Sequence, residues 1–185
     1  METNTKNYII DLAQTYRANL KSQYKTIPTP VKNILENELE FKIDVVNLSE
    51  EKQNDMIKIG EFIVTDENNF NIYIDKSLSN QEQQMILGYF LTIYKLKHEF
   101  YPIDLVKRIY KSIPEGKIII NESFAIHAFA YELLMPTKEF LRHEINLPIE
   151  LEETEKVIAL ANIFNVPVNL ARHQLMNIYH GVEPH

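Results

Sequence analysis

The chain has 185 residues, 45% of them hydrophobic, so it is long enough to bury the core of one ordinary domain. Its 26 acidic residues outnumber its 19 lysines and arginines, and the net charge of −7 argues against a phosphate-binding surface spread over the whole protein. The absence of cysteine excludes disulfides, thiolate zinc sites and thiol catalysis, so any metal site would have to use histidines and carboxylates.

The N-terminal segment has polar residues before a short apolar stretch and no small-residue cleavage site, unlike a signal peptide. A run of about 18 consecutive apolar residues, as in a membrane-spanning helix, occurs nowhere in the chain. We therefore expect a soluble, cytoplasmic protein that does not contact a membrane.

The first predicted element is an amphipathic helix over residues 5–24, because its apolar side chains recur at spacings of three and four. These side chains are Tyr8, Ile9, Leu12, Tyr16 and Leu20. The two prolines at 28 and 30 break this helix, and Thr29 followed by Pro30 predicts the start of a second helix over 31–38.

Three β-rich runs follow, at residues 41–46, 61–65 and 71–75. The turn-forming residues 66–69 predict that the second and third runs pair as a hairpin. Ser79 with Glu82 predicts a capping box at the start of a long helix over residues 81–97. The buried face of that helix is predicted from Met85, Ile86, Tyr89, Phe90, Ile93 and Tyr94.

The middle of the chain is predicted to be helical at 105–110 and to turn at 114–116. Residues 118–120 are consistent with either a short strand or the approach to a helix. A helix of small and apolar residues over 122–134 should end at Met135-Pro136, because proline disfavours helix before it.

Three helices are predicted after Pro136. Thr137 can cap a short one, the acidic residues 150–155 favour the start of one that includes 157–164, and a last helix should reach Tyr179. The last two resemble a helix-turn-helix, which raises DNA binding as a rival function. Because Arg172 is the only lysine or arginine within 161–185, we expect no direct nucleic-acid binding.

Three stretches carry a resemblance to a known family. They are Asn71-Ile-Tyr-Ile-Asp-Lys-Ser-Leu-Ser79, Phe129-Ala-Tyr-Glu-Leu-Leu-Met-Pro136 and Leu160-Ala-Asn-Ile-Phe-Asn-Val-Pro167. Together with the order of elements from about Pro30 onward, these stretches resemble the ImmA/IrrE-type zinc metallopeptidases. The second stretch is the most specific, because it matches the family's signature FAxELLMP. The resemblance implies an α+β, zincin-like minidomain over residues 27–185, with a small mixed sheet packed on central helices and a helix-turn-helix-like C-terminal segment. Residues 1–26 would be an extra N-terminal helix.

The resemblance also indicates which side chains are missing. In the family, a His-Glu-x-x-His motif on the helix after the Ser cap supplies two zinc ligands one turn apart and a general base between them. The matching positions here hold Tyr89, Phe90 and Ile93, and the family's third ligand, a Glu, is replaced at about Ala125. We therefore expect no catalytic residues, no peptidase activity and no bound metal or other cofactor.

The six histidines are residues 98, 127, 143, 173, 180 and 185, and none has another three or four residues away. No pair of histidines is therefore expected on one helix face. A noncanonical metal site from His127 with Glu122 or Glu132 remains an alternative. In the competing interpretation, the polar side chain of His127 has its hydrogen bonds satisfied within a helical core, and Glu132 has a helix-capping or hydrogen-bonding role.

We expect that the scaffold now binds another protein. Tyr89, Phe90, Ile93 and His127 are predicted to line a partner-binding groove, because extended peptides bind edge strands beside such a helix; alternatively, these rings are simply core. Family members accompany helix-turn-helix repressors on phages and mobile genetic elements, which suggests a pseudoenzyme in transcription regulation with a repressor as its protein or peptide partner. A metallopeptidase with noncanonical ligands and a structural oligomer are the rival hypotheses.

Overall fold

The computed structural model describes residues 2–66, 69–100, 106–113, 117–119 and 124–180. The protein is α+β, as predicted, with helices and one mixed sheet. The chain divides into two compact units. The sheet unit spans residues 31–122, and the helical unit combines residues 1–30 with residues 123–185.

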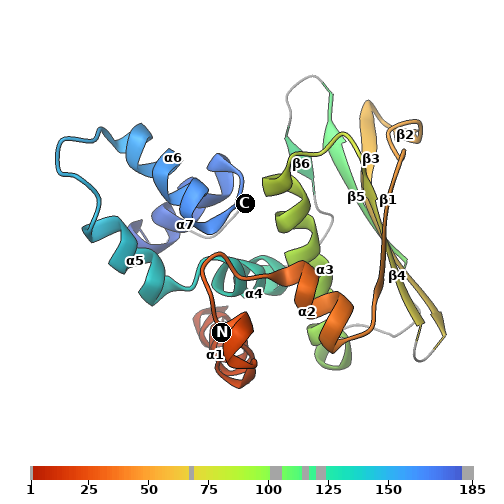
Figure 1. Ribbon diagram of the computed structural model, residues 1–185, viewed down its shortest axis with the longest axis horizontal. Coiled ribbons are helices and arrows are strands. Elements are labelled where there is room, and N and C mark those ends of the chain that lie inside the picture. The colour runs from red at the N-terminus through yellow and green to blue at the C-terminus, as the bar shows by residue number, and fades with distance from the viewer. Residues whose placement is uncertain (1, 67–68, 101–105, 114–116, 120–123, 181–185) are drawn as a thin grey trace. The chain divides into compact units, whose positions relative to one another are not determined.

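The sheet unit contains every strand of the described chain and two helices (Figure 1). Its elements are α2 (Val31–Glu38), β1 (Lys42–Val46), β2 (Lys52–Gln53), β3 (Met56–Asp66), β4 (Asn69–Asp75), α3 (Asn80–Phe100), β5 (Lys107–Ser112) and β6 (Ile118–Ile119). The strand order is β1-β4-β3-β5-β6, and β2 pairs with β3. β1 runs parallel to β4, whereas the other pairs are antiparallel.

Local sequence signals account for the hairpin and for the start of α3. β3 and β4 pair antiparallel, with Gly60 opposite Ile74 and Val64 opposite Phe70, which confirms the predicted hairpin; residues 67 and 68 of its turn lie outside the described residues. The capping box is also confirmed. The Ser79 amide donates to the Glu82 carboxylate at 2.9 Å, and the Glu82 amide donates to the Ser79 hydroxyl oxygen at 3.3 Å.

An aromatic cluster forms much of the core of the sheet unit. Phe62 on β3 stacks on Phe90 of α3 with ring centroids 5.7 Å apart, and the Phe41 ring meets the edge of Tyr94 at 4.9 Å. Helix α3 comes close to the sheet at Gly60, where an added Cβ would lie 2.9 Å from Cγ2 of Ile86 and 3.3 Å from the Phe90 ring. The absence of a side chain at Gly60 is therefore required by this packing.

Gly60→Ala should lower the free energy of unfolding by about 1–3 kcal/mol, because the added methyl group has to displace packed side chains rather than solvent. Urea denaturation followed by circular dichroism measures this change. An unchanged midpoint would contradict the close approach of α3 to β3.

The expected helix at 105–110 is wrong within its described part, because Lys107–Ser112 forms β5. This strand pairs antiparallel with β3, with Arg108 opposite Glu61 and Tyr110 opposite Lys58. A six-residue run with few apolar side chains carries little periodicity, and the long-range pairing with β3 decides its conformation. Ile118–Ile119 forms the short strand β6, one of the two interpretations left open, whereas the turn at 114–116 lies outside the described residues.

The helical unit contains the two ends of the described chain. Its elements are α1 (Glu2–Asn19), a 3-10 turn (Ser22–Tyr24), α4 (Phe124–Leu134), α5 (Thr137–Ile145), α6 (Glu153–Phe164) and α7 (Val168–His180). Helix α1 packs on α4, where the Tyr16 and Phe129 rings are 6.2 Å apart. Ile9 and Ala13 form the fully buried part of α1, whereas Tyr8, expected on the apolar face, is exposed.

The structure corrects two expectations for this unit. Residues 1–26 do not form a part separate from residues 27–185, because α1 packs against α4 and belongs to the same compact unit as the C-terminal helices. Thr137 does not cap α5, since the residue before the helix is Pro136 and the Thr137 hydroxyl donates instead to Glu132 at 2.7 Å. The end of α4 before Pro136 and the acidic start of α6 agree with the sequence predictions.

Candidate functional site

The residues at the family's zinc-binding and general-base positions are buried on α3. Tyr89, Phe90 and Ile93 expose 1%, 0% and 2% of their surfaces. Phe90 packs against Phe62 and beside Gly60 within the sheet unit, as a core side chain does. A partner at the predicted groove would therefore have to contact neighbouring residues rather than these three side chains.

His127, the fourth residue of the predicted groove, lies on α4 in the helical unit and is half-buried. Ala125, at the position of the family's third ligand, is also on α4 and is buried. Within the part of the chain that the structure describes, no three histidine, aspartate or glutamate side chains are grouped as a metal site requires. Of the two carboxylates considered for a site with His127, Glu122 lies outside the described residues.

The other carboxylate, Glu132, has a structural role in the helical unit. It is 4% exposed, and its oxygens accept hydrogen bonds from the Gln14 amide at 3.0 Å and from the Thr137 hydroxyl at 2.7 Å. The Thr137 backbone amide donates to it at 3.3 Å, so this carboxylate joins the end of α4 to the start of α5 and to α1. The capping and hydrogen-bonding interpretation of Glu132 is confirmed.

Burial raises the pKa of Glu132, and the hydrogen bonds from Thr137 and Gln14 only partly oppose that rise. No lysine or arginine nitrogen of the described residues lies within 4.0 Å of its oxygens. Its donors are thus neutral amides and a hydroxyl. Glu132 is a buried carboxyl group whose charge is not neutralised by direct contact with a cation.

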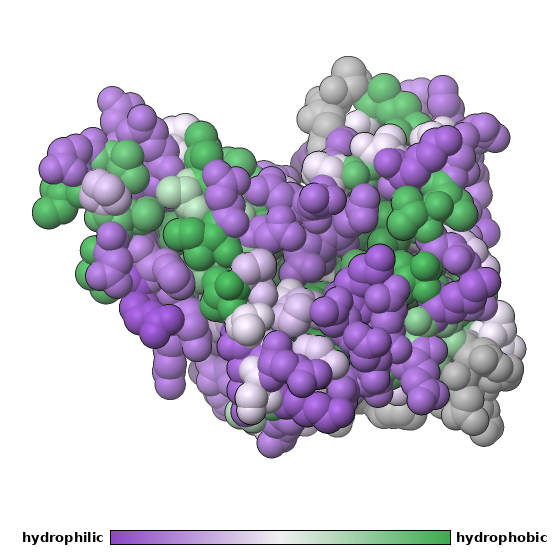
Figure 2. Space-filling view, in the orientation of Figure 1, coloured by the Kyte–Doolittle hydropathy of each residue, from purple (hydrophilic) through white to green (hydrophobic). Residues whose placement is uncertain are grey.

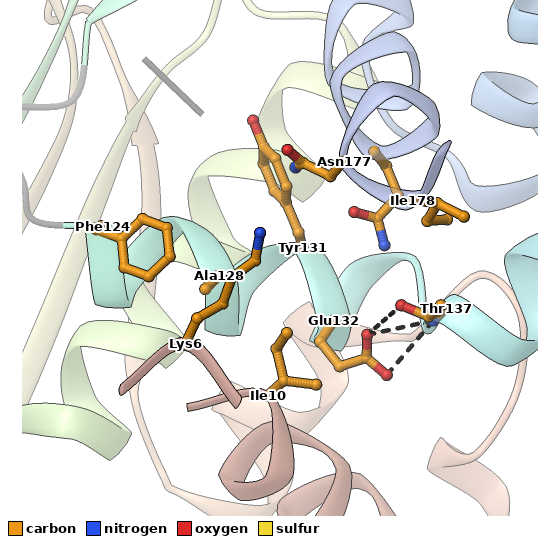
Figure 3. A pocket seen from close by; sticks show the side chains of 10 residues that line it. Lys6, Ile10, Phe124, Ala128, Tyr131, Glu132, Thr137, Asn177 and Ile178 are labelled. Atoms are coloured by element: carbon orange, nitrogen blue, oxygen red, sulfur yellow. Dashed lines mark hydrogen bonds between the residues drawn. The ribbon is translucent and has the colours of Figure 1, made fainter. Parts of the chain in front are cut away.

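Glu132 lines a pocket of about 220 Å³ between helices of this unit. Figure 3 shows its lining side chains: Lys6, Ile10, Phe124, Ala128, Tyr131, Glu132, Thr137, Gln174, Asn177 and Ile178. The walls are mostly apolar, and Lys6 holds its ammonium group 5.9 Å from the centre of the Phe124 ring. The volume is that of a group about the size of one side chain and is too small for a large cofactor.

Glu132 also lines a second pocket, of about 330 Å³, together with Arg17, Lys25, Lys138 and Glu139. The cations Arg17 and Lys25 already have contacts there. Arg17 donates to the Thr29 hydroxyl at 2.6 Å, and Lys25 donates to the Ala18 carbonyl at 2.5 Å at the end of α1. Burial lowers the pKa of Arg17, which the charge of Glu139 opposes. These contacts hold the segment that follows α1 against the end of that helix.

Two histidines far apart in the sequence approach one tyrosine in the helical unit. The Tyr131 hydroxyl on α4 lies 3.4 Å from Nδ1 of His173 on α7, and the His127 ring lies 6.2 Å from the Tyr131 ring. Burial lowers the pKa of His127, and the charge of His173 lowers it further. The sequence gives no signal for His173, because its neighbours lie on a different helix and no spacing along the chain relates them.

A cluster of charged side chains on the sheet unit has a structural role, because its charges pair with one another. Lys58 is buried and contacts Glu51 at 2.6 Å and Glu61 at 3.2 Å. Arg108 contacts the same two carboxylates, each at 2.9 Å. The hydrogen bond from Lys58 lowers the pKa of Glu51. The cluster neutralises its own charges and joins the segment before β3 to β3 and β5.

The chain is thus an α+β protein with a pocket between the helices of its helical unit. Neither a protein-family model nor a curated protein matches the chain. No helix of the described residues is long and apolar enough to span a membrane.

Proposed function

We propose that the chain is a catalytically inactive, metallopeptidase-like protein that acts by binding a protein partner. The three stretches that resemble the ImmA/IrrE family support a zincin-like origin for the scaffold. Buried Tyr89, Phe90 and Ile93 at the positions of the zinc ligands and general base support the loss of peptidase chemistry. The partner suggested by the same resemblance is a helix-turn-helix repressor of a phage or mobile genetic element.

The helical unit is the part of the chain that best supports partner binding. Large hydrophobic side chains are exposed on α5, on α6, on α7 and between α5 and α6, and Figure 2 shows hydrophobic surface among hydrophilic side chains over these helices. These residues are Ile145, Ile149, Ile158, Met176 and Tyr179. Single exposed hydrophobic residues are common on protein surfaces, but here they accompany a pocket lined partly by α7.

The single observation that carries the proposal is the buried carboxyl of Glu132 in the wall of a mostly apolar pocket, where it accepts hydrogen bonds from Gln14 and Thr137 but has no direct contact with a cation of the described residues. Such a pocket suits an aliphatic chain that ends in a cation, because the walls cover the methylene groups and Glu132 pairs with the charge. Lys6 already places a cation over Phe124 at this pocket. A DNA-binding partner is rich in lysine and arginine, which complements the net charge of −7 of this chain.

The pocket is tested with Nα-acetyl-lysine amide as the probe and Nα-acetyl-norleucine amide as the uncharged control. In a ¹H–¹⁵N NMR titration, the lysine derivative should shift amides around Ala128 and Asn177, whereas the norleucine derivative should not. Glu132→Gln should abolish these shifts, and Glu139→Gln, which replaces a side chain that lines the second pocket and not the first, should preserve them. Equal shifts with both probes, or shifts that persist in Glu132→Gln, would contradict the proposal.

A further inference from the structure

The side chain of Gln174 on α7 has an unused acceptor at the pocket that Glu132 lines. Gln174 is 5% exposed, and its Nε2 atom donates to the backbone carbonyl of Met135 at 3.0 Å. Because a carbonyl can only accept, this contact fixes which end of the amide group is the nitrogen. The other end, Oε1, accepts no hydrogen bond from the residues that the structure describes. A buried acceptor without a protein donor is uncommon, which points to a donor on a ligand.

Gln174 and Glu132 contact the two ends of one short segment, Met135-Pro136-Thr137. Gln174 donates to the carbonyl oxygen of Met135, and Glu132 accepts from the backbone amide and the hydroxyl of Thr137 (Figure 3). Both side chains also line the same pocket of about 220 Å³. A cavity of this size, with both groups in its wall, places the Gln174 oxygen and the Glu132 carboxylate within reach of one head group.

The Glu132 carboxylate has room for about one more hydrogen bond, since an ionised carboxylate offers roughly four acceptor positions. Three donors are already present. They are the Gln14 amide at 3.0 Å, the Thr137 hydroxyl at 2.7 Å and the Thr137 backbone amide, which lies 3.3 and 3.4 Å from the two oxygens. A guanidinium group binds a carboxylate best through two parallel hydrogen bonds, and these donors leave no pair of positions for it.

We propose that this pocket is specific for a primary ammonium group, as at the end of an unmodified lysine side chain, and that Gln174 determines this specificity. An ammonium group has three donors and no acceptor, so it can donate once to Glu132 and once to Oε1 of Gln174. Asn177, one turn after Gln174, lines the same pocket and has no hydrogen bond to a described residue, so its side-chain oxygen offers a third acceptor.

The inference rests on the proposed function, because it concerns the same pocket and the same cation-ended side chain of a partner. The lysine of this chain at the pocket, Lys6, does not fill the position between Glu132 and Gln174. Its ammonium group lies over the Phe124 ring, and it is not among the donors to the Glu132 carboxylate. Modification of the partner's lysine should release it, since trimethylation removes every donor and acetylation removes the charge as well.

The test is a ¹H–¹⁵N NMR titration of the full chain with the Nα-acetyl amides of lysine, arginine and trimethyl-lysine. The lysine derivative should bind at least about ten-fold more tightly than either of the others. Trimethyl-lysine keeps the positive charge and the methylene chain but has no N–H to donate, so it separates attraction by charge from hydrogen bonding. Arginine keeps the charge and the donors but arranges them in a planar fork.

Gln174→Met removes the acceptor and keeps the length of the side chain. It should weaken binding of the lysine derivative about ten-fold and leave the affinity for trimethyl-lysine unchanged, which a general distortion of the pocket would not do. Met176→Ala is the matched control, because Met176 lies on the same helix, is 42% exposed and does not line the pocket. Circular dichroism establishes that both variants are folded. If Gln174→Met does not fold, the ranking of the three derivatives by the parent protein decides.

The outcomes separate this inference from the proposed function. Equal binding of all three derivatives, lost in Glu132→Gln, would leave the proposed function in place and overturn the specificity. A folded Gln174→Met variant that binds lysine as the parent does, or that loses lysine and trimethyl-lysine equally, would also overturn it. Failure of every derivative to bind would overturn the proposed function and this inference together.

Discussion

Replacing Phe90 with alanine should lower the free energy of unfolding by about 3–5 kcal/mol. Phe90 is fully buried, stacks on Phe62 and closes the space above Gly60, so its removal leaves a cavity between α3 and the sheet. Phe90→Asp should prevent folding of the sheet unit, because an unpaired carboxylate would lie in that core. Urea denaturation and circular dichroism measure both effects.

The matched control is Val106→Ala, since Val106 precedes β5 and exposes 53% of its surface. This variant should change stability by less than about 0.5 kcal/mol. A folded Phe90→Asp variant with the stability of the parent would show that the ring is not a core side chain. If that variant also failed to bind a partner that the parent binds, the groove predicted from the sequence would be supported instead.

Asp75→Asn should lower the free energy of unfolding by about 2–3 kcal/mol, because charged hydrogen-bond acceptors contribute more than neutral ones. Asp75 is fully buried at the end of β4. One carboxylate oxygen accepts from the amides of Leu48 and Ser49 at 2.6 and 2.7 Å, and the other accepts from the amide and hydroxyl of Ser77. The asparagine amide group would point its own hydrogens at some of these donors.

The effect of Asp75 should depend on pH. Burial alone would raise its pKa, but the hydrogen bonds from Ser77, Leu48 and Ser49 more than offset this and lower it. The carboxylate therefore contributes its full stabilisation above the unfolded-state pKa of about 3.9, and this contribution is lost as the pH falls through the lower folded-state pKa. The stability difference between the parent and Asp75→Asn should shrink over that range.

Unfolding free energies at several pH values between neutrality and the acid transition measure this difference. Asp44→Asn provides the comparison: Asp44 lies in β1, its side chain is 35% exposed and it contacts only Lys42 among the ion pairs of the described residues. That variant should differ from the parent by less than about 0.5 kcal/mol. A difference that does not change with pH would contradict the ionised, hydrogen-bonded state of Asp75.

The sequence alone determined those elements whose signals are local. The capping box of Ser79 and Glu82 starts α3, Pro136 ends α4, and alternating apolar residues on either side of a polar turn form β3 and β4. Each depends on side chains within a few residues of the backbone they stabilise. The burial of Phe90 followed equally from the helical spacing of apolar residues along α3.

Only the tertiary structure decided the features that depend on distant partners. Lys107–Ser112 became a strand through its pairing with β3, and α1 joined the C-terminal helices through its contact with α4. The approach of His173 to Tyr131 spans 42 residues of sequence, and the Glu132 carboxylate reaches Gln14 across 118. Local periodicity identifies which face of a helix is apolar, but not which of the other helices that face will contact. The contact between Tyr131 and His173 therefore depends on the packing of α7 near α4, which no local pattern in the sequence specifies.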